Sequence, residues 1–207
     1  MKPTRPIAHL TREITDAETS DDLELTRRAA MGDDEARRAL VTRLFKRVHR
    51  TLSYLSNDPE ETRDLAQQAL IQILLYSGHF RGDASLEAWA DRVSVQTAAK
   101  QLEKRARRTR LAQNIWHLPD AVPAVDEQVS MHECRARLAH LLSQLPYKLR
   151  EPLVLRYLHG YSMAEICELV NAPLDTVRSR LKAGKKKLEK KLSNDPVMRS
   201  FIGRRTK

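Results

Sequence analysis

Hydrophobic residues recur every three or four positions along most of the chain, the spacing that gathers them on one face of an α-helix. In the first half this pattern predicts a short helix from residue 21 and longer helices over about 40–55, 59–76 and 85–111. The chain holds six glycines in 207 residues, too few for the turns of a large β protein. The pattern therefore predicts an all-α fold.

The second half shows the same periodicity in shorter segments. They are predicted helices over about 132–145, 146–158, 162–170 and 174–192. The last two are joined by a tight turn, the arrangement of a helix-turn-helix module. Such a module inserts its second helix into the major groove of DNA.

Helix start signals support these boundaries. Ser162 and Glu165 have the spacing of a capping box, in which each side chain accepts a hydrogen bond from the other's backbone N–H. Asp58, Pro59 and Glu61 form a similar start, with a capping carboxylate, a proline in the first helical position and a glutamate in the first turn. Both signals place a helix immediately after them.

The helical pattern stops over residues 118–129, where Pro119 and Pro123 indicate a linker. We expect two small helical domains joined by this acidic, flexible segment. The expected parts are a flexible N-terminal tail (1–20), a first domain (21–113), the linker (114–130), a second domain (131–194) and a C-terminal tail (195–207).

Charge is concentrated at the end of each domain. The net charge is +10 and the isoelectric point about 9.9. Residues 97–115 carry +5 and residues 176–192 carry +7, whereas residues 116–134 between them carry −4. Two separate basic helices favour an anionic partner.

Several classes of protein are excluded. No apolar run approaches the ~18–20 residues that a membrane span requires, so we expect no membrane insertion, and residues 1–20 lack the apolar core of a signal peptide. The two cysteines, Cys134 and Cys167, exclude a disulfide-dense scaffold. His132, Cys134 and His140 lack metal-ligand spacing, because residues two apart on a helix point to different faces. With no phosphate loop or nucleophile elbow in the sequence, we expect no enzyme, cofactor or metal.

The last helix carries the chemistry of a DNA reader. Val177 and Leu181 are four residues apart and are expected to face the core, so that Arg178, Ser179 and Lys182 point outward. A guanidinium can pair with guanine O6 and N7, while hydroxyls and lysines suit phosphates. The lysines further along allow two interpretations, phosphate contacts or compensation of the helix C-terminus.

At this point both halves resemble the sigma-70 family of bacterial RNA polymerase initiation factors, in the short extracytoplasmic-function (ECF) class. The resemblance covers about residues 21–192, in the family's order and spacing. It rests on DLAQQ at 64–68, FRGDAS at 80–85, Trp89 followed by a basic helix, LPYKLR at 145–150, GYSMAEI at 160–166 and TVRSRL at 176–181.

The resemblance implies a transcription initiation factor that binds core polymerase, recognises the −10 and −35 promoter elements and assists promoter melting. The first domain would be sigma region 2 and the second sigma region 4, a helix-turn-helix. Implied partners are promoter DNA and the polymerase core, mainly the β′ clamp coiled coil and also β. The family also commonly uses an anti-sigma factor. The implied location is cytoplasmic, associated with the nucleoid.

The resemblance also implies three groups of site residues. The −35 group is Thr176, Arg178, Ser179, Arg180, Lys182, Lys185 and Lys186. The −10 group is Phe80, Arg81, Asp83, Ser85, Gln96, Lys100, Lys104 and Arg107, in which Phe80 is the candidate to stack on an unpaired base and Trp89 is assigned to the core. The core-docking group is Asp64, Leu65, Gln67, Gln68 and Ile71.

Five positions depart from the family's pattern. Gln68 stands where a carboxylate is usual, Gln96 where asparagine is usual, and Asp175 where glycine is usual. Ala183 and Gly184 replace bulkier, often basic residues, and a glycine inside the helix costs about 0.5–1 kcal/mol relative to alanine. A freestanding helix-turn-helix regulator is the alternative function, but it leaves DLAQQ and FRGDAS unexplained.

Overall fold

In the computed structural model, residues 16–111 and 131–205 are described. They form nine α-helices and one short 3₁₀ helix, with no strand in these two ranges. The elements are α1 (Asp16–Ala30), α2 (Asp34–Leu55), α3 (Pro59–Leu75), η1 (Ser77–His79), α4 (Leu86–Leu111), α5 (Met131–Ser143), α6 (Tyr147–Leu158), α7 (Met163–Val170), α8 (Leu174–Asn194) and α9 (Pro196–Arg205). The predicted all-α fold is confirmed.

The helices begin where the start signals predicted. The Asp58 carboxylate accepts a hydrogen bond from the Glu61 backbone at 2.8 Å, with Pro59 in the first position of α3. Ser162 and Glu165 form the complete capping box at the start of α7. These bonds satisfy backbone N–H groups that the first turn of a helix otherwise leaves unpaired.

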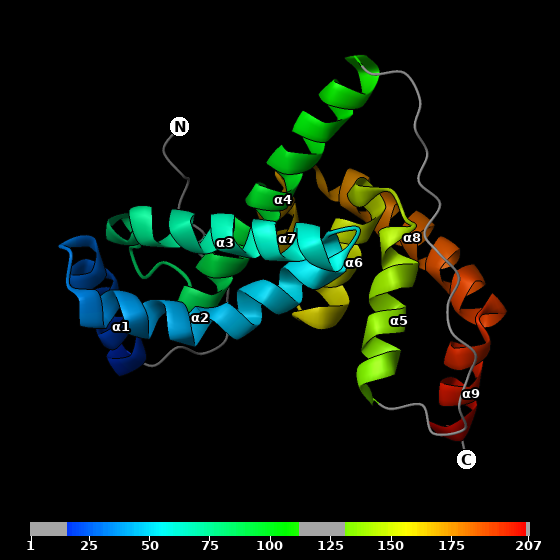
Figure 1. Cartoon of the computed structure of the whole chain (residues 1–207), viewed down its shortest axis with the longest axis horizontal. Coiled ribbons are helices and arrows are strands. Elements are labelled where there is room, and N and C mark those ends of the chain that lie inside the picture. The colour runs from blue at the N-terminus through cyan, green and yellow to red at the C-terminus, as the bar shows by residue number, and fades with distance from the viewer. Residues whose placement is uncertain (1–15, 112–130, 206–207) are drawn as a thin grey trace.

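Helices α1–α4 form the first lobe (Figure 1), centred on α2, which packs against α1, α3 and α4. The α2 residues at helical spacing that face this centre are 0% exposed, as the periodicity predicted. They are Leu40, Leu44, Val48 and Leu52. The C-terminal part of α4 projects away from the rest of the molecule (Figure 1), and it carries the first basic run.

Helices α5–α9 form the second lobe, in which α6, α7 and α8 pack together. Val177 of α8 and Ile166 of α7 are both fully buried, as expected for the inner faces of a helix-turn-helix. The turn between α7 and α8 places Asn171 at φ 49°, a left-handed conformation that asparagine tolerates better than most residues. This turn fixes α8 across α7.

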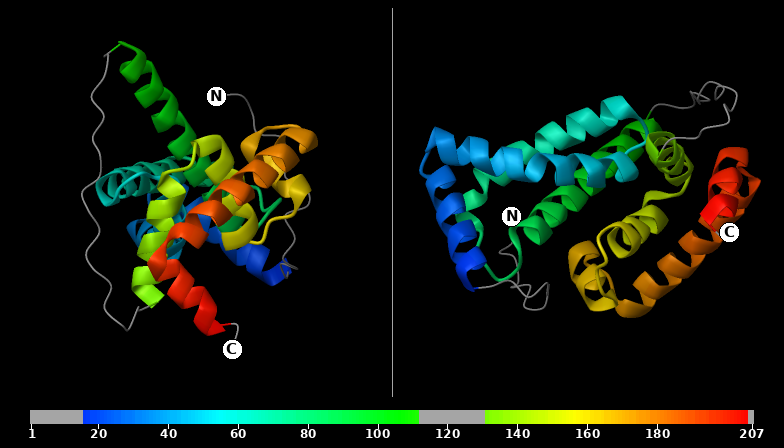
Figure 2. Two further views of the ribbon diagram at one scale, coloured as in Figure 1. Left: turned by 90° about the vertical axis from the view of Figure 1, so that its right-hand side faces the viewer. Right: turned by 90° about the horizontal axis from the view of Figure 1, so that it is seen from below.

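The two lobes are in contact. Helix α2 packs against α5 and α6 of the second lobe, and α4 packs against α7. Figure 2 shows the lobes side by side from two further directions. The predicted linker at 114–130 lies outside the described residues.

The expected tails differ from the structure at both ends. Helix α1 begins at Asp16, so residues 16–20, assigned to the N-terminal tail, are helical. The segment assigned to the C-terminal tail forms α9, which packs against α5 and α8. Asp195 explains this, because its carboxylate accepts the Met198 N–H at 3.0 Å and bonds Arg137 of α5 at 2.5 Å.

None of the described helices combines the length and the apolar character needed to cross a bilayer.

Candidate nucleic-acid interface

The first turns of α8 present polar and cationic side chains away from the second lobe. Arg178, Ser179 and Lys182 are exposed, and Thr176 and Arg180 are half-buried at the edge of this face. The opposite face carries Val177, which is fully buried. The structure therefore brings Arg178, Ser179 and Lys182 together on one outer face in the N-terminal half of the second helix of a helix-turn-helix, with Thr176 and Arg180 at its edge.

One carboxylate accompanies these cations. Asp175 lies in the first turn of α8 with its side chain 95% exposed, and its Oδ1 is 3.5 Å from Nη1 of Arg178. Sequence reasoning noted Asp175 only as a departure from a glycine. Its position beside Arg178 makes it part of the same surface.

The predicted lysines lie one and two turns further along α8. Lys185 and Lys186 are exposed, and Lys185 Nζ is 3.8 Å from Glu189. Lys191, at the end of the helix, donates a hydrogen bond to Gln144, in the turn after α5, at 2.5 Å. The lysine run is therefore divided between an open face and a contact within the lobe.

The loop between η1 and α4 differs from expectation at its aromatic residue. Phe80 is 8% exposed, with its ring centroid 5.8 Å from that of Trp89, so the structure places it in the first lobe's core. The loop folds back at Gly82, whose φ of +72° is in the left-handed region that favours glycine. In this conformation Phe80 presents no stacking surface.

The remaining −10 residues lie around this loop and along α4. Arg81 and Asp83 are exposed, whereas Ser85 caps α4 by accepting the Ala88 N–H at 3.1 Å. Gln96 and Lys100 are exposed and four residues apart, on one face of α4. Lys104 and Arg107 belong to the projecting part of α4.

The predicted docking surface on α3 consists of exposed polar residues with an apolar end. Asp64, Gln67 and Gln68 are exposed, and Ile71 is 48% exposed. Leu65 does not belong to this surface, because it is 2% exposed and packs into the core. Its assignment to the docking group is therefore wrong, because Leu65 is on the side of α3 that carries the buried residues Ala66, Ala69 and Ile73.

Sequence reasoning missed Leu75, the last residue of α3. Its side chain is 70% exposed and it follows Ile71 by four residues, so both lie on one face of the helix. The i, i+4 spacing was the available signal. Leu75 extends the apolar end of the α3 surface.

The side chain of His132 lies outside the described part of the structure, and Cys134 and His140 are described. Among the described residues there is no group of three or more His, Cys, Asp or Glu side chains that could hold a metal ion. Cys134 is buried, and burial raises the pKa of its thiol. His140 contacts Gln144, in the turn that follows α5, at 3.0 Å.

Known families match both lobes. A family model described as "Sigma-70 region 2" matches residues 40–108, and one described as "Sigma-70, region 4" matches residues 135–188. The first match contains α3 and the predicted −10 residues. The second contains the predicted −35 residues.

Similar proteins cover most of the chain. The RNA polymerase sigma-H factor of Pseudomonas aeruginosa is 28% identical over 188 residues, which cover 86% of this chain and 96% of that protein. The ECF RNA polymerase sigma-E factor of Haemophilus influenzae is 30% identical over 193 residues, which cover 88% of this chain and 100% of that protein.

Two solved structures share the fold. CnrH in complex with the cytosolic domain of CnrY has a TM-score of 0.57 at 22% identity, covering 84% of this chain and 98% of that one. The sigma factor RpoE in complex with the anti-sigma factor NepR from Bartonella quintana has a TM-score of 0.61 at 18% identity, covering 75% of this chain and 95% of that one.

Proposed function

The chain belongs to the sigma-70 family, in its ECF class of RNA polymerase sigma factors, and we propose that it directs core polymerase to promoters through two DNA-binding surfaces and one docking surface. The second lobe reads the −35 element, the first lobe binds the −10 element and assists melting, and α3 docks on the polymerase. The polymerase supplies the chemistry.

The observation that carries this proposal is the division of α8 into two faces. Its inner face is fixed in the second lobe by fully buried Val177, and its outer face presents Arg178 and Lys182. Both cations lie in the N-terminal half of α8, far from the C-terminal turn where the helix dipole favours cations, so stabilisation of the helix does not explain them. Contact with DNA explains these cations, because the second helix of such a module inserts into the major groove.

The −10 element is assigned to the face of α4 that carries Gln96 and Lys100 and to the adjacent loop with Arg81 and Asp83. Melted DNA requires cations that follow the backbone and polar groups that contact unpaired bases. The exposure of these four side chains supports the assignment. Phe80 supports the loop from the core rather than touching DNA in this conformation.

Core polymerase is the first proposed protein partner, with α3 docking on the β′ clamp coiled coil and a further contact to β. Asp64, Gln67 and Gln68 supply the polar part of this surface, and Ile71 and Leu75 supply its apolar end. An anti-sigma factor is the second proposed partner, since the structural relative RpoE was solved bound to one.

Run-off transcription from a promoter library tests the proposal, with core polymerase mixed with this protein, with Arg178→Ala or with Arg135→Ala. The control removes an exposed cation of α5 outside the proposed surface. We expect the wild type and Arg135→Ala to start RNA at promoters that share two separated motifs, and Arg178→Ala to change the preference at one −35 position.

A lack of RNA from every promoter, together with a failure of core polymerase to capture the protein, would contradict the proposal. Tight binding to duplex DNA without polymerase would instead support a freestanding regulator.

A further inference from the structure

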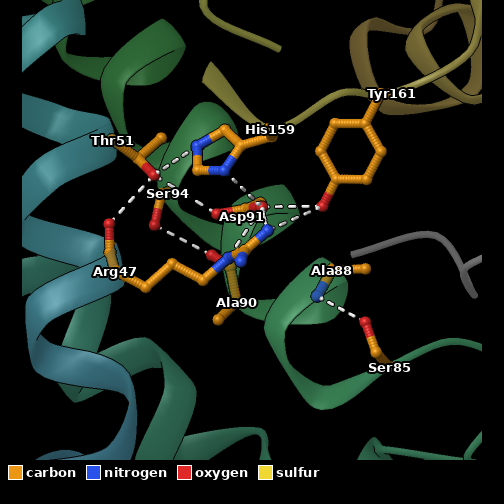
Figure 3. Close-up of polar contacts among 9 residues, drawn as sticks. All are labelled: Arg47, Thr51, Ser85, Ala88, Ala90, Asp91, Ser94, His159 and Tyr161. Atoms are coloured by element: carbon orange, nitrogen blue, oxygen red, sulfur yellow. Dashed lines mark hydrogen bonds and ion pairs between the residues drawn. The ribbon is translucent and has the colours of Figure 1, made fainter. Parts of the chain in front are cut away.

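Carboxylates with structural roles in this protein lie among buried donors or cap a helix. Asp91 of α4 is 0% exposed, and its Oδ2 accepts hydrogen bonds from Arg47 and from the Tyr161 hydroxyl, each at 2.6 Å (Figure 3). Asp58 caps α3 by accepting the Glu61 N–H at 2.8 Å. In both arrangements a hydrogen-bond donor lies within 2.8 Å of the carboxylate.

Asp175 of α8 fits neither arrangement. Its side chain is 95% exposed. Among the described residues its polar partner is Arg178, whose Nη1 lies 3.5 Å from Oδ1, longer than the roughly 2.7–3.2 Å of an ordinary hydrogen bond. An exposed pair with this geometry contributes little to stability. The fold therefore gives Asp175 only the general role of an acid in the first turn of a helix, where the helix dipole favours one.

Asp175 lies on the face of α8 that points away from the second lobe. Residues three, four and seven positions further along a helix return to the same side, and here they are Arg178, Ser179 and Lys182, all exposed. Val177, on the opposite side, is fully buried. Asp175 thus adds a carboxylate to a surface of cations and a hydroxyl, in the part of the helix whose side chains contact base edges in helix-turn-helix complexes.

A carboxylate on a surface that approaches DNA phosphates is unfavourable unless it binds a hydrogen-bond donor. In the major groove guanine presents two acceptors, and thymine presents an acceptor and a methyl group, so neither base offers a donor. Adenine presents an amino group beside the N7 acceptor, whereas cytosine itself presents only its N4 amino group. Cytosine is therefore the base that a carboxylate at this position prefers.

The spacing of Asp175 and Arg178 suits two adjacent base pairs. Residues three apart on a helix have Cβ atoms about 5–6 Å apart, and successive base pairs are ~3.4 Å apart. In zinc fingers, side chains at this spacing on one helix contact successive bases. The guanidinium of Arg178 prefers guanine O6 and N7. Together the two side chains match a guanine with a cytosine at the neighbouring position.

We propose that Asp175 is a specificity-determining residue, which accepts a hydrogen bond from cytosine N4 in the −35 element, next to the guanine assigned to Arg178. The same carboxylate disfavours DNA that lacks this cytosine, because it then faces acceptors and phosphates without a donor. This inference deepens the proposed function and rests on it for the identity of the DNA element. The base preference itself can be measured without polymerase.

The test selects duplexes from a promoter library randomised over the −35 element, using the full-length chain alone and in holoenzyme with core polymerase. Asp175→Asn replaces the carboxylate with an amide of similar size, which can pair with adenine N6 and N7. Asp175→Ala removes the polar group. Glu189→Gln is the matched control, because it removes one negative charge from the same helix about 21 Å further along its axis, where Glu189 pairs with Lys185.

We expect wild type and Glu189→Gln to select a cytosine next to a guanine, with cytosine favoured about fivefold at its position. Asp175→Asn should change the preferred base from cytosine to adenine, and Asp175→Ala should accept all four bases there. The preference for the neighbouring guanine should be retained in both. A role confined to the helix dipole would leave the preferred base unchanged, and the control accounts for any gain in affinity that the lost charge gives to every sequence.

Selection of the wild-type motif by both Asp175 variants would overturn the inference, as would a wild-type motif without the cytosine. Far-UV circular dichroism checks that the variants fold, and Asp175→Asn alone decides the result if Asp175→Ala does not fold. If the holoenzyme starts RNA at no promoter although the chain alone selects this motif, the proposed function fails and the assignment of Asp175 stands. If no sequence is selected under either condition, both fail.

Discussion

Gly184 of α8 lies directly against the Leu149 carbonyl of α6, so that a Cβ at position 184 would be 2.9 Å from that oxygen and 3.0 Å from Leu153 Cδ1. The closeness of the two helices explains a glycine that sequence reasoning could describe only as a weak point. Because residue 184 has no side chain, α8, the helix that carries the candidate DNA residues, can pack closely against α6.

Gly184→Ala should therefore destabilise the protein, although alanine is the better helix former. The gain in helix propensity is about 0.5–1 kcal/mol, whereas overpacking against a backbone oxygen costs about 1–3 kcal/mol. We expect urea denaturation to show a lower free energy of unfolding. Ala183→Gly, on the exposed side of the helix, is the control and should lose only the propensity difference. A more stable Gly184→Ala protein would contradict this close packing.

Arg178→Ala should weaken discrimination at one base pair of the −35 element. A bidentate guanidinium–guanine pair contributes about 1–3 kcal/mol of specificity. The measurement is the affinity of the holoenzyme for a set of promoters that differ at single −35 positions. An equal loss on every sequence would show that Arg178 only contacts the backbone.

Replacing Lys185, Lys186 and Lys187 together with alanine should change the salt dependence of DNA binding rather than the sequence preference that Arg178→Ala alters. Phosphate contacts add affinity for every sequence and release counterions, so the slope of log K against log salt should flatten by ~0.9 for each phosphate that a lysine no longer neutralises. An unchanged slope would assign these lysines to a solvated face.

Phe80→Ala should lower the free energy of unfolding by about 3 kcal/mol, because Phe80 is buried against Trp89 and its removal leaves a cavity. Phe80→Leu should cost less than about 1.5 kcal/mol and retain binding to −10 single-stranded DNA. Chemical denaturation and fluorescence anisotropy measure the two effects. A stable leucine variant that no longer binds the −10 strand would restore the stacking role for this ring.

Glu151 should make stability depend on pH. Burial raises the pKa of its carboxyl from 4.5 to about 7, although the Tyr147 hydroxyl and the cations Arg180 and Lys148 oppose the rise. The folded state holds the proton more tightly than the unfolded state, so the stability from this group is complete below pH 4.5 and is lost as the pH rises through 7.

Most of this loss falls between pH 4.5 and 6.5, and we expect the free energy of unfolding to fall by a further amount of about 0.8 kcal/mol between pH 6.5 and 8.5, with Glu151→Gln flattening this dependence. His159 does not interfere, because its lowered pKa affects stability only below about pH 6.5. Glu60→Gln, at an exposed site, is the control. A wild-type profile retained in Glu151→Gln would assign the dependence to another group.

Gln68→Glu should strengthen docking on the polymerase, since it restores the carboxylate usual in the family. A surface ion pair contributes up to about 1 kcal/mol, roughly a fivefold change in affinity. Competition for core against another sigma factor measures it, and Gln144→Glu makes the same change on a distant exposed site. Equal competition by Gln68→Glu and wild type would count against α3 as the docking surface.

Local signals predicted the helices well. The capping box at Ser162 and the inward position of Val177 depend on neighbours within one or two turns, and the structure confirms both. The two outer faces that carry the candidate DNA residues follow from the same periodicity. The docking group was the exception on a helix, because Leu65, assigned to it by resemblance, is 2% exposed, and Leu75, which was not assigned, is 70% exposed.

Long-range packing could not be predicted in this way. Phe80 is in a polar segment, and only the fold of the loop at Gly82 brings its ring onto Trp89. The bond from Tyr161 to Asp91 joins residues 70 positions apart, with no pattern that links them. Residues 195–207 were assigned to a tail, whereas Asp195 and Pro196 start α9, because the same residue types can stop one helix and start the next.

Asp195 also determines how the second lobe can be cut out as a fragment. The match to Sigma-70 region 4 ends at residue 188, but the carboxylate that holds Arg137 of α5 comes seven residues later, and Met198 beyond it is 7% exposed. A fragment trimmed at the family boundary would leave that guanidinium, only 20% exposed, without its anion. An excised promoter-reading module should therefore extend through residue 205.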